Sequence, residues 1–321
     1  MIVRDGMRSA VLLICAALSS AALADTELTV MTFNIWGGGA NQGKPIDETV
    51  AVIRAVNPDI IGLQETRVES DPCEAESCRP AGESVARQLA AALGYYHYDQ
   101  TASNEALWAN AVISRYSFVG EATPNDTGIA IDVAGRRVQV FNVHLDDSPY
   151  QPYQLLKIGY GPHPVLKTAR ETIRAAEATR GAGLKLLFAD MAVAGKADAV
   201  FVFGDFNEPS HRDWSAATVR AGLQPLRVAF PSVRALEKRG FVDLFRRAHP
   251  DPVDKPGFTW TPTTDPQSPD DHHDRIDFTL AKAQSLRVIA AGIVGEKSPQ
   301  ADIVVAPWPS DHRASYARVR F

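Results

Sequence analysis

Short apolar runs, rich in β-branched and aromatic residues, recur along the chain and predict buried β-strands. They span Leu28 to Trp36, Ile60 to Leu63, Tyr95 to Tyr98, Ala111 to Ser114, Ile129 to Val133, Arg137 to Val143, Ala199 to Phe203, Phe258 to Thr261, Arg275 to Ala281, Leu286 to Val294 and Ser315 to Phe321. Helical spacing of apolar residues predicts helices at Pro45 to Val56, Gly82 to Leu93, Lys167 to Ala192, Ser215 to Gly222 and Phe241 to Ala248.

Two helix-rich stretches set against many strands in hairpin-like succession favour an α+β fold over a strictly alternating parallel sheet. The helix from Lys167 to Ala192 is expected to break at Gly181 and Gly183. Residues 146–164 lose all periodicity and collect Pro, Tyr and Gly, so they predict a long loop. No low-complexity linker or repeat divides residues 25–321, which are therefore expected to form one domain.

Polar residues stand where several of the apolar runs stop. They are Asn34, Glu65, His144, Asp205 with Asn207, Asp277, and the pair Asp311 and His312. If each run is a strand, these residues lie at the rim of a sheet, where they face solvent. Oxygen ligands combined with two imidazoles suit the metal-assisted hydrolysis of a phosphoester.

The first 24 residues predict a secretory signal peptide. Arg4 and Arg8 give it a positive start, Ala10 to Leu18 is too short to span a bilayer, and Ala22 to Ala24 form a cleavage motif. Cleavage after Ala24 would produce an exported protein, periplasmic or secreted, with no later apolar run long enough for a membrane span. A buried N-terminal helix is the alternative interpretation.

Export would leave Cys73 and Cys78 as the remaining cysteines, because Cys15 lies within the signal peptide. An even number of cysteines in an oxidising compartment predicts one disulfide, with a pair of free thiols as the alternative. The whole chain has a formal net charge of −5, and removal of the signal peptide makes it −6. This acidic balance does not favour nucleic acid as a partner, although a local basic groove would permit it.

The hydrolysis of a phosphoester requires charge neutralisation, a positioned water and a protonated leaving oxygen. Mg²⁺ prefers oxygen ligands, which suits Glu65 as a direct ligand, and Mn²⁺ or Ca²⁺ could replace it. His144 and His312 could divide the proton transfers, since histidine titrates nearest neutrality. A carboxylate such as Asp277 or Asp311 could fix the tautomer of His312.

Each motif taken alone also has an ordinary structural interpretation. Gly-Asp-Phe-Asn after a strand is commonly a turn, and Glu65 could simply precede a helix N-terminus. A lone His144 could be structural, and the cluster from Asp270 to Asp274 is expected to be a solvated loop. The complete set of motifs in order is what favours catalysis.

That ordered set, from Val30 to the C-terminus, resembles the endonuclease/exonuclease/phosphatase superfamily. The resemblance implies a four-layer α/β sandwich with two central, mainly antiparallel sheets flanked by helices. It also implies that Asn34 and Glu65 belong to the metal site. Asp205 and Asn207 would contact the metal, the phosphate and the attacking water.

The same resemblance implies roles for the histidines. His144 would bind the phosphate and assist the leaving group. His312 would act as the base or as a phosphate-binding partner, next to the metal-side Asp311 and oriented by Asp277. The segment 146–164 matches no motif of the family, and we expect it to shape the substrate pocket, with a merely solvent-covering loop as the alternative.

Three functions fit this sequence. The first is an exported Mg²⁺-dependent phosphoesterase that acts on a small or lipid-linked phosphodiester or phosphomonoester. Sphingomyelinase activity is a variant of it, suggested by aromatic residues expected to be exposed: Trp36, Tyr150, Tyr153 and Tyr160. The second is an extracellular nuclease that uses the same site, with phosphate contacts from arginines if the fold gathers them near His144: Arg136, Arg137, Arg246 and Arg247. The third is a non-catalytic binding module of the same fold.

Overall fold

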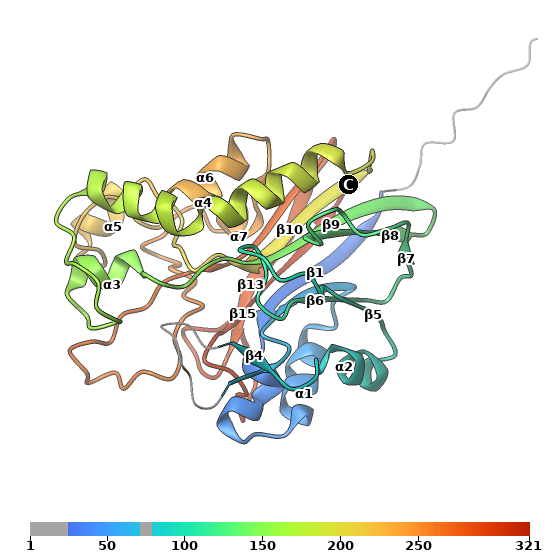
Figure 1. The fold of residues 1–321 in the computed structure, drawn as a ribbon, viewed down its shortest axis with the longest axis horizontal. Coiled ribbons are helices and arrows are strands. Elements are labelled where there is room, and N and C mark those ends of the chain that lie inside the picture. The colour runs from blue at the N-terminus through green and yellow to red at the C-terminus, as the bar shows by residue number, and fades with distance from the viewer. Residues whose placement is uncertain (1–24, 71–78) are drawn as a thin grey trace, which may run out of the picture.

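Two β-sheets pack face to face in the computed structural model, which describes residues 25–70 and 79–321 (Figure 1). The seven-stranded sheet has the order β14-β13-β15-β1-β2-β6-β5, and the six-stranded sheet has the order β11-β12-β10-β9-β8-β7. The first sheet contains β1 (Glu27–Asn34), β2 (Ile60–Gln64), β5 (Tyr96–Asp99), β6 (Ala111–Ser114), β13 (Arg287–Gly295), β14 (Ile303–Val304) and β15 (Ala314–Arg320). The second contains β7 (Phe118–Val119), β8 (Gly128–Val133), β9 (Arg136–His144), β10 (Ala199–Asp205), β11 (Val242–Asp243) and β12 (Asp277–Ala283).

Helices cover the outer face of each sheet. Among them, α1 and α2 lie on the seven-stranded sheet, and α4 and α6 lie on the six-stranded sheet (Figure 1). The helices are α1 (Ile46–Val56), α2 (Ala86–Leu93), α3 (Gln151–Leu156), α4 (Ala169–Val193), α5 (Ala216–Arg220), α6 (Pro231–Glu237), α7 (Leu244–Ala248) and the 3-10 helix η1 (Trp36–Gln42). A small separate ribbon pairs β3 (Val68–Glu69) with β4 (Pro80–Ala81). Within the described part of the chain, no helix is both long and apolar enough to cross a bilayer.

The layers follow from where the apolar side chains point. One buried cluster fills the space between the two sheets and includes Ile60, Val140 and Phe203. A second cluster, with Phe33 and Ile53, lies between the seven-stranded sheet and its helices, and a third lies beneath α4. Alternate residues of the strands supply opposite faces, so each sheet is buried on both sides. The predicted α+β sandwich of two mainly antiparallel sheets is confirmed, with parallel pairs at β1–β2, β9–β10 and β13–β14.

The long helix α4 corrects one sequence prediction. It runs from Ala169 to Val193 without the break expected at Gly181 and Gly183. Glycine lowers the intrinsic stability of a helix but does not end it, because tertiary packing of the helix compensates for that loss. Gly183 is needed for another reason, since a Cβ atom there would lie 2.3 Å from the carbonyl oxygen of Glu105. The missing side chain lets α4 approach the loop that precedes β6.

Other sequence predictions also need correction. The segment 146–164 contains the helix α3, whose early Pro152 suits a first helical turn. The strand expected from Phe258 to Thr261 is reduced to single bridges from Trp260 to Asp274 and to His312. Helix α6, of seven residues, was not predicted. The helix expected from Phe241 to Ala248 divides into β11 and α7.

The two glycines of α4 give a matched test of this packing. Gly183→Ala should lower the free energy of unfolding by about 1–3 kcal/mol, because the added methyl group meets backbone that cannot move aside freely. Gly181→Ala has open space around it and should raise the free energy of unfolding by roughly 0.5–1 kcal/mol through helix propensity. Urea titrations would measure both, and equal effects at the two positions would contradict this account.

Candidate active site

The strand register of the six-stranded sheet gathers three of the predicted residues. Strands β9 and β10 are parallel and pair His144 with Asp205 at their ends. The first residue of the antiparallel β12, Asp277, pairs with Asp205 on the other side. His144, Asp205 and Asp277 therefore lie side by side in three adjacent strands.

The seven-stranded sheet brings its own residues to the same end. Parallel pairing of β1 with β2 sets Asn34 opposite Gln64, so that Glu65 follows at once. His312 comes just before β15, which runs antiparallel to β1. The amide of Asn34 donates hydrogen bonds to Glu65 Oε1 at 2.7 Å and to Asp205 Oδ2 at 3.1 Å. Asn34 thus joins the rims of the two sheets.

His144 and Asn207 form one side of the cluster. The Asn207 amide group donates to Nε2 of His144 at 3.0 Å and to the carbonyl oxygen of Leu145 at 3.0 Å. The backbone N–H of Asn207 donates to Asp205 Oδ1 at 2.8 Å. Nε2 of His144 lies 3.7 Å from Asp205 Oδ2 and 4.0 Å from Glu65 Oε1. These contacts hold the His144 ring against the carboxylates.

His312 and Asp277 form the other side. Nδ1 of His312 donates to Asp277 Oδ2 at 2.9 Å, and its Nε2 lies 3.5 Å from Asp205 Oδ2. Burial alone would lower the pKa of His312, but Asp277, Asp205 and Asp311 together raise that pKa well above its ordinary value. Of the two carboxylates considered from the sequence, Asp277 is the one that orients the imidazole.

Glu65 and Asp311 supply acidic oxygens without protein partners. Glu65 Oε2 and Asp311 Oδ1 are buried and accept no hydrogen bond from the described residues. Burial, followed by the charge of Asp311, raises the pKa of Glu65 well above its usual value. Burial likewise raises the pKa of Asp311. Such crowding of acids is unfavourable in a bare protein and becomes favourable beside a cation.

The donor set fits a hard divalent cation. Glu65, Asp205 and Asp311 line one cavity with carboxylate oxygens, the ligand type that Mg²⁺ prefers, and the amide N–H group of Asn34 joins the first two. A second grouping of possible ligands consists of Asp205, Asp277 and His312, whose nearest ligand atoms all lie within 4.8 Å of one another. Both sets contain buried carboxylate oxygens without a hydrogen-bond partner among the described residues: Glu65 Oε2 and Asp311 Oδ1 in the first, and Asp277 Oδ1 in the second. In the second set the other oxygen of Asp277 accepts from His312, which leaves the first set with more free acidic oxygens.

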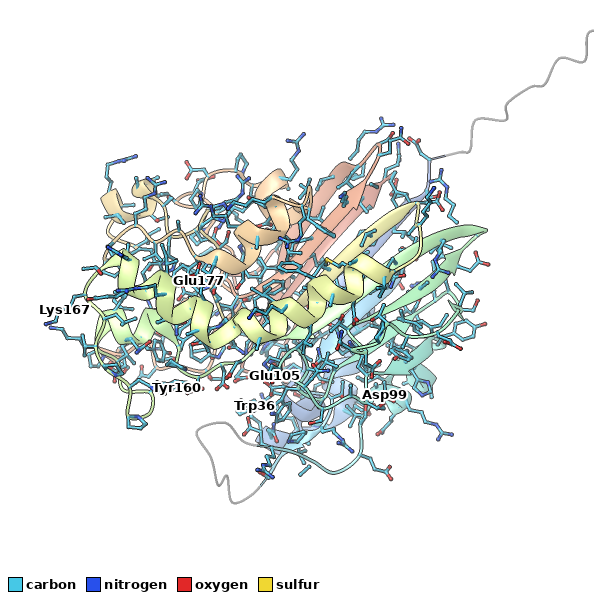
Figure 2. The ribbon with its side chains drawn as sticks, turned by 45° about the horizontal axis from the view of Figure 1, so that its top comes forward. Trp36, Asp99, Glu105, Tyr160, Lys167 and Glu177 are labelled. Atoms are coloured by element: carbon cyan, nitrogen blue, oxygen red, sulfur yellow. The ribbon has the colours of Figure 1, made fainter. Side chains whose placement is uncertain are left out.

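A cavity of about 300 Å³ opens over this cluster. Its lining includes most of the predicted site residues together with Glu69 of β3 and residues from several loops. The loop residues are Asn104, Glu105, Leu107, Trp108, Leu145, Asp146, Asp147, Tyr160 and Trp260. Asp146, Asp147 and Tyr160 come from the segment 146–164, which therefore shapes the cavity. Figure 2 places Glu105 and Tyr160 below α4 in that view.

The backbone at the site is held in unusual conformations. Glu65 and Asn207 have φ angles of 54° and 47°, in the left-handed region that favours glycine, and Trp36 has a φ of 44°. Non-glycine residues adopt this region only where the surroundings enforce it, and such positions cluster at functional sites. Both Glu65 and Asn207 turn sharply at the end of a strand, which aims their side chains at the cavity.

The structure does not meet the condition on which the arginines were suggested, and two other sequence expectations need correction. Arg246 is buried beside Asp213, and Arg136 begins strand β9, which ends at His144, so these arginines are not gathered at the site. Tyr150 and Tyr153 are 3% and 8% exposed and belong to a buried aromatic cluster rather than to the surface. The cluster from Asp270 to Asp274, which was expected to be a solvated loop, is only partly exposed to solvent.

Asp274 accounts for the buried part of that acidic cluster. It is 1% exposed and accepts hydrogen bonds from Tyr150 Oη at 2.8 Å and from Trp214 Nε1 at 2.8 Å. A buried carboxylate needs such donors, and the aromatic residues that supply them come from distant parts of the chain. The local sequence around Asp274 does not indicate these aromatic hydrogen-bond donors.

Sequence reasoning missed the cavity walls. Trp108 packs edge-on against His144, with ring centroids 6.1 Å apart, and Trp260 lies 6.3 Å from the ring of His312. Glu69 and Glu105 also line the cavity. These residues lie in loops or short elements without a recognisable motif, and only the tertiary fold places them beside the histidines.

The comparisons with known proteins agree with this geometry. The sequence profile of the Endonuclease/Exonuclease/phosphatase family matches residues 31–312, and the chain belongs to this family. Its members are hydrolases that act on phosphoesters and are generally dependent on a divalent metal. An uncharacterized protein from Caenorhabditis elegans is 26% identical over 327 residues, covering 92% of this chain and 91% of the relative.

Solved structures share the fold at low sequence identity. An endonuclease/exonuclease/phosphatase from Beutenbergia cavernae has a TM-score of 0.54 at 21% identity, covering 92% of this chain and 72% of that one. A family protein from Leptotrichia buccalis has a TM-score of 0.54 at 16% identity, with 92% and 100% covered. TDP2 from D. rerio, complexed with a single-strand DNA product, has a TM-score of 0.52 at 13% identity, with 92% and 99% covered. These matches confirm the fold.

The crowded carboxylates predict that removing the charge of Glu65 stabilises the metal-free protein. Because the pKa of Glu65 is raised above 4.5 in the fold, its ionisation opposes folding increasingly as the pH rises above that value. Glu65→Gln should therefore raise the Tm of chelator-treated protein at pH 7, and the gain should shrink near pH 4. The same variant should lose most of the Tm increase that Mg²⁺ gives to the wild type.

Thermal unfolding with EDTA or with excess Mg²⁺ measures both effects. Glu121→Gln, at an exposed glutamate outside the cavity, is the matched control and should behave as the wild type. A Glu65→Gln protein that keeps the full response to Mg²⁺ would instead favour the grouping of Asp205, Asp277 and His312 as the metal site.

Proposed function

We propose that this protein is an exported, Mg²⁺-dependent phosphoesterase that hydrolyses a small or lipid-linked phosphodiester or phosphomonoester. One observation carries the proposal: Asn34, Glu65 and Asp205 meet at the junction of two sheets, with an imidazole on either side. A binding module would have no need for two histidines held in this way around unpartnered carboxylate oxygens.

A bound divalent cation would neutralise the phosphate charge and polarise the phosphoryl oxygen. Glu65, Asp205 and Asp311 would hold it, with Mn²⁺ or Ca²⁺ as alternatives to Mg²⁺. The amide N–H group of Asn34 faces Glu65 and Asp205, so Asn34 would orient these two ligands. Its side-chain oxygen accepts from the backbone N–H of Trp36 at 3.2 Å, which keeps the side chain in this orientation.

The remaining residues carry the proton transfers. The oxygen of a water molecule forms a bond to phosphorus as the bond from phosphorus to the alcohol oxygen breaks. A cation held by Asp205 and Asp311 would oppose the rise in the pKa of His312, so that Nε2 could take the water proton, while Asp277 holds the proton on Nδ1 and stabilises the resulting charge. His144 contacts the phosphate and assists the departing oxygen, and Asn207 orients its ring.

His312→Gln should test this assignment. Loss of a general acid or base lowers kcat by about 10²–10⁴-fold, and EDTA-sensitive hydrolysis of bis(p-nitrophenyl) phosphate would show the loss. His97→Gln is a suitable control, because His97 lies on β5 with 38% of its side chain exposed and outside the cavity. Full activity in the His312→Gln variant would refute the catalytic role.

Export is supported by the sequence of residues 1–24, which lie outside the described residues, as do Cys73 and Cys78. We expect a bacterial host to cleave the chain after Ala24, leaving Asp25 as the first residue. Intact-mass measurement of the exported protein would show this cleavage. Repeating the measurement after reduction would report the proposed disulfide as a gain of two hydrogens. An uncleaved chain confined to the cytoplasm would contradict export.

A second candidate function is a nuclease. It is favoured by the likeness to TDP2 from D. rerio, whose solved complex contains a single-strand DNA product. The arginines suggested by the sequence do not support it, since they are not gathered at His144. Digestion of DNA that falls steeply with added salt would favour this alternative.

A further inference from the structure

A second cavity lies at the other end of the six-stranded sheet. Its volume of about 750 Å³ exceeds the 300 Å³ of the cavity over the candidate active site, and the described linings of the two share no residue. Strands β9 and β10 begin beside the second cavity and end at His144 and Asp205, so the two cavities lie at opposite ends of the same strands. A volume in this range is typical of sites for small molecules.

The floor of the second cavity follows from the strand register. Gln139, Val200 and Lys282 lie side by side in β9, β10 and β12. Helix α4 lies over this sheet and forms the opposite wall (Figure 1). The larger apolar side chains of the lining come from β9, from the C-terminal half of α4 and from the residue before β11: Phe141, Phe188, Met191 and Phe241. The space between helix and sheet therefore suits an apolar molecule.

Two cations at the rim are held in place by this cavity. The guanidinium group of Arg239 lies 3.6 Å from the ring centroid of Phe188, and its Nη1 donates to the carbonyl oxygen of Ala235 at 3.0 Å. Nζ of Lys282 donates to the carbonyl oxygen of Arg239 at 2.8 Å. Neither cation forms an ion pair with an acid of the described chain. The other N–H groups of both side chains can therefore bind an anion.

The nearest acid does not cancel this charge. Asp198 is the one acid among the described lining residues, and its Oδ2 accepts from the backbone N–H of Arg137 at 2.9 Å. The guanidinium group of Arg137 also lies at this rim, since a Cβ atom on the lining residue Gly195 would be 3.8 Å from its Nε. Three cations and one acid around an apolar cavity favour a negatively charged ligand.

A polar group in the floor also lacks a protein partner. Gln139 is 2% exposed, yet its side-chain amide forms no hydrogen bond with the described residues. Buried amide groups are almost always hydrogen bonded, so whatever fills the cavity has to supply the partner. An apolar molecule without a polar group would leave this amide unsatisfied.

We propose that this cavity binds an amphipathic carboxylate, such as a medium-chain fatty acid. The carboxylate would lie between Arg239 and Lys282, because a guanidinium group can donate to both oxygens at once. The apolar body would lie along Phe188 and over Val200, across strands β9 to β12, which are about 10 Å apart. The inference goes beyond the proposed function, since this site takes no part in hydrolysis.

Calorimetry with three ligands of one chain length tests the proposal. Octanoate, 1-octanol and octyltrimethylammonium share the apolar chain and differ in the charge of the head group. We expect octanoate to bind with one-to-one stoichiometry and with a Kd about tenfold lower than that of either other ligand, because only its head group complements the two cations. Equal affinity for the three, or no saturable binding of octanoate, would overturn the proposal.

A double variant locates the carboxylate. Arg239→Gln with Lys282→Gln should raise the Kd for octanoate about tenfold or more and leave the Kd for 1-octanol nearly unchanged. Arg87→Gln with Lys297→Gln is the matched control, because it removes the same charges at exposed positions outside the cavity and should bind octanoate as the wild type does. An unchanged Kd for octanoate in the cavity variant would overturn the assignment.

Vesicles distinguish a free carboxylate from an anionic membrane. Binding to phosphatidylglycerol vesicles that depends on Arg239 and Lys282, without binding of octanoate, would overturn the proposal in favour of a lipid surface. The calorimetry needs no turnover and so separates this inference from the proposed function. Selective binding of octanoate by a protein that hydrolyses no phosphoester would support the second site and refute the phosphoesterase, and hydrolysis without such binding would do the reverse.

Discussion

A buried amide network between the two sheets fixes the spacing on which the candidate site depends. The side chain of Asn142 on β9 accepts a hydrogen bond from Gln64 Nε2 on β2 at 2.6 Å and donates to the carbonyl oxygen of Leu63 at 2.9 Å. Directly beside it, a Cβ atom on Gly62 would lie 2.6 Å from Cβ of Phe203. The sheets therefore approach closely at this point, one or two residues before Glu65 and His144.

This contact explains why residues from separate sheets can act on one ligand. Amide groups that hydrogen bond in a dry core permit little sliding, because any displacement would leave a buried donor or acceptor unpaired. Glu65 follows Gln64 directly, and His144 follows Asn142 by two residues, on the same face of β9. The network thus transmits the packing of the sheets to the positions of the two side chains.

Much of the fold and the identities of the central site residues could be predicted from sequence, whereas the cavity walls could not. A buried strand is apolar at both faces, so a polar residue such as Asn34, Glu65 or Asp205 at its end is conspicuous, and parallel strands bring such ends together. Trp108 and Trp260 have no such signal, since their positions depend on loops packed by distant contacts. The same limit applies to α4, where the role of Gly183 is visible only once the loop carrying Glu105 is in place.

The site is built at the expense of stability, and this constrains what can bind there. Burial raises the pKa of Glu65 and of Asp311, so the fold would be more stable with both groups uncharged, and their place at one rim is understandable if a cation compensates them. Likeness of fold does not carry a substrate from one family member to another, because the walls, not the sheets, set the local charge. A polyanion such as DNA gains affinity by contacts with lysine and arginine, and the described walls of this cavity provide acids and aromatic rings instead. The acidic walls therefore favour the phosphoesterase that we propose over a nuclease that uses the same site.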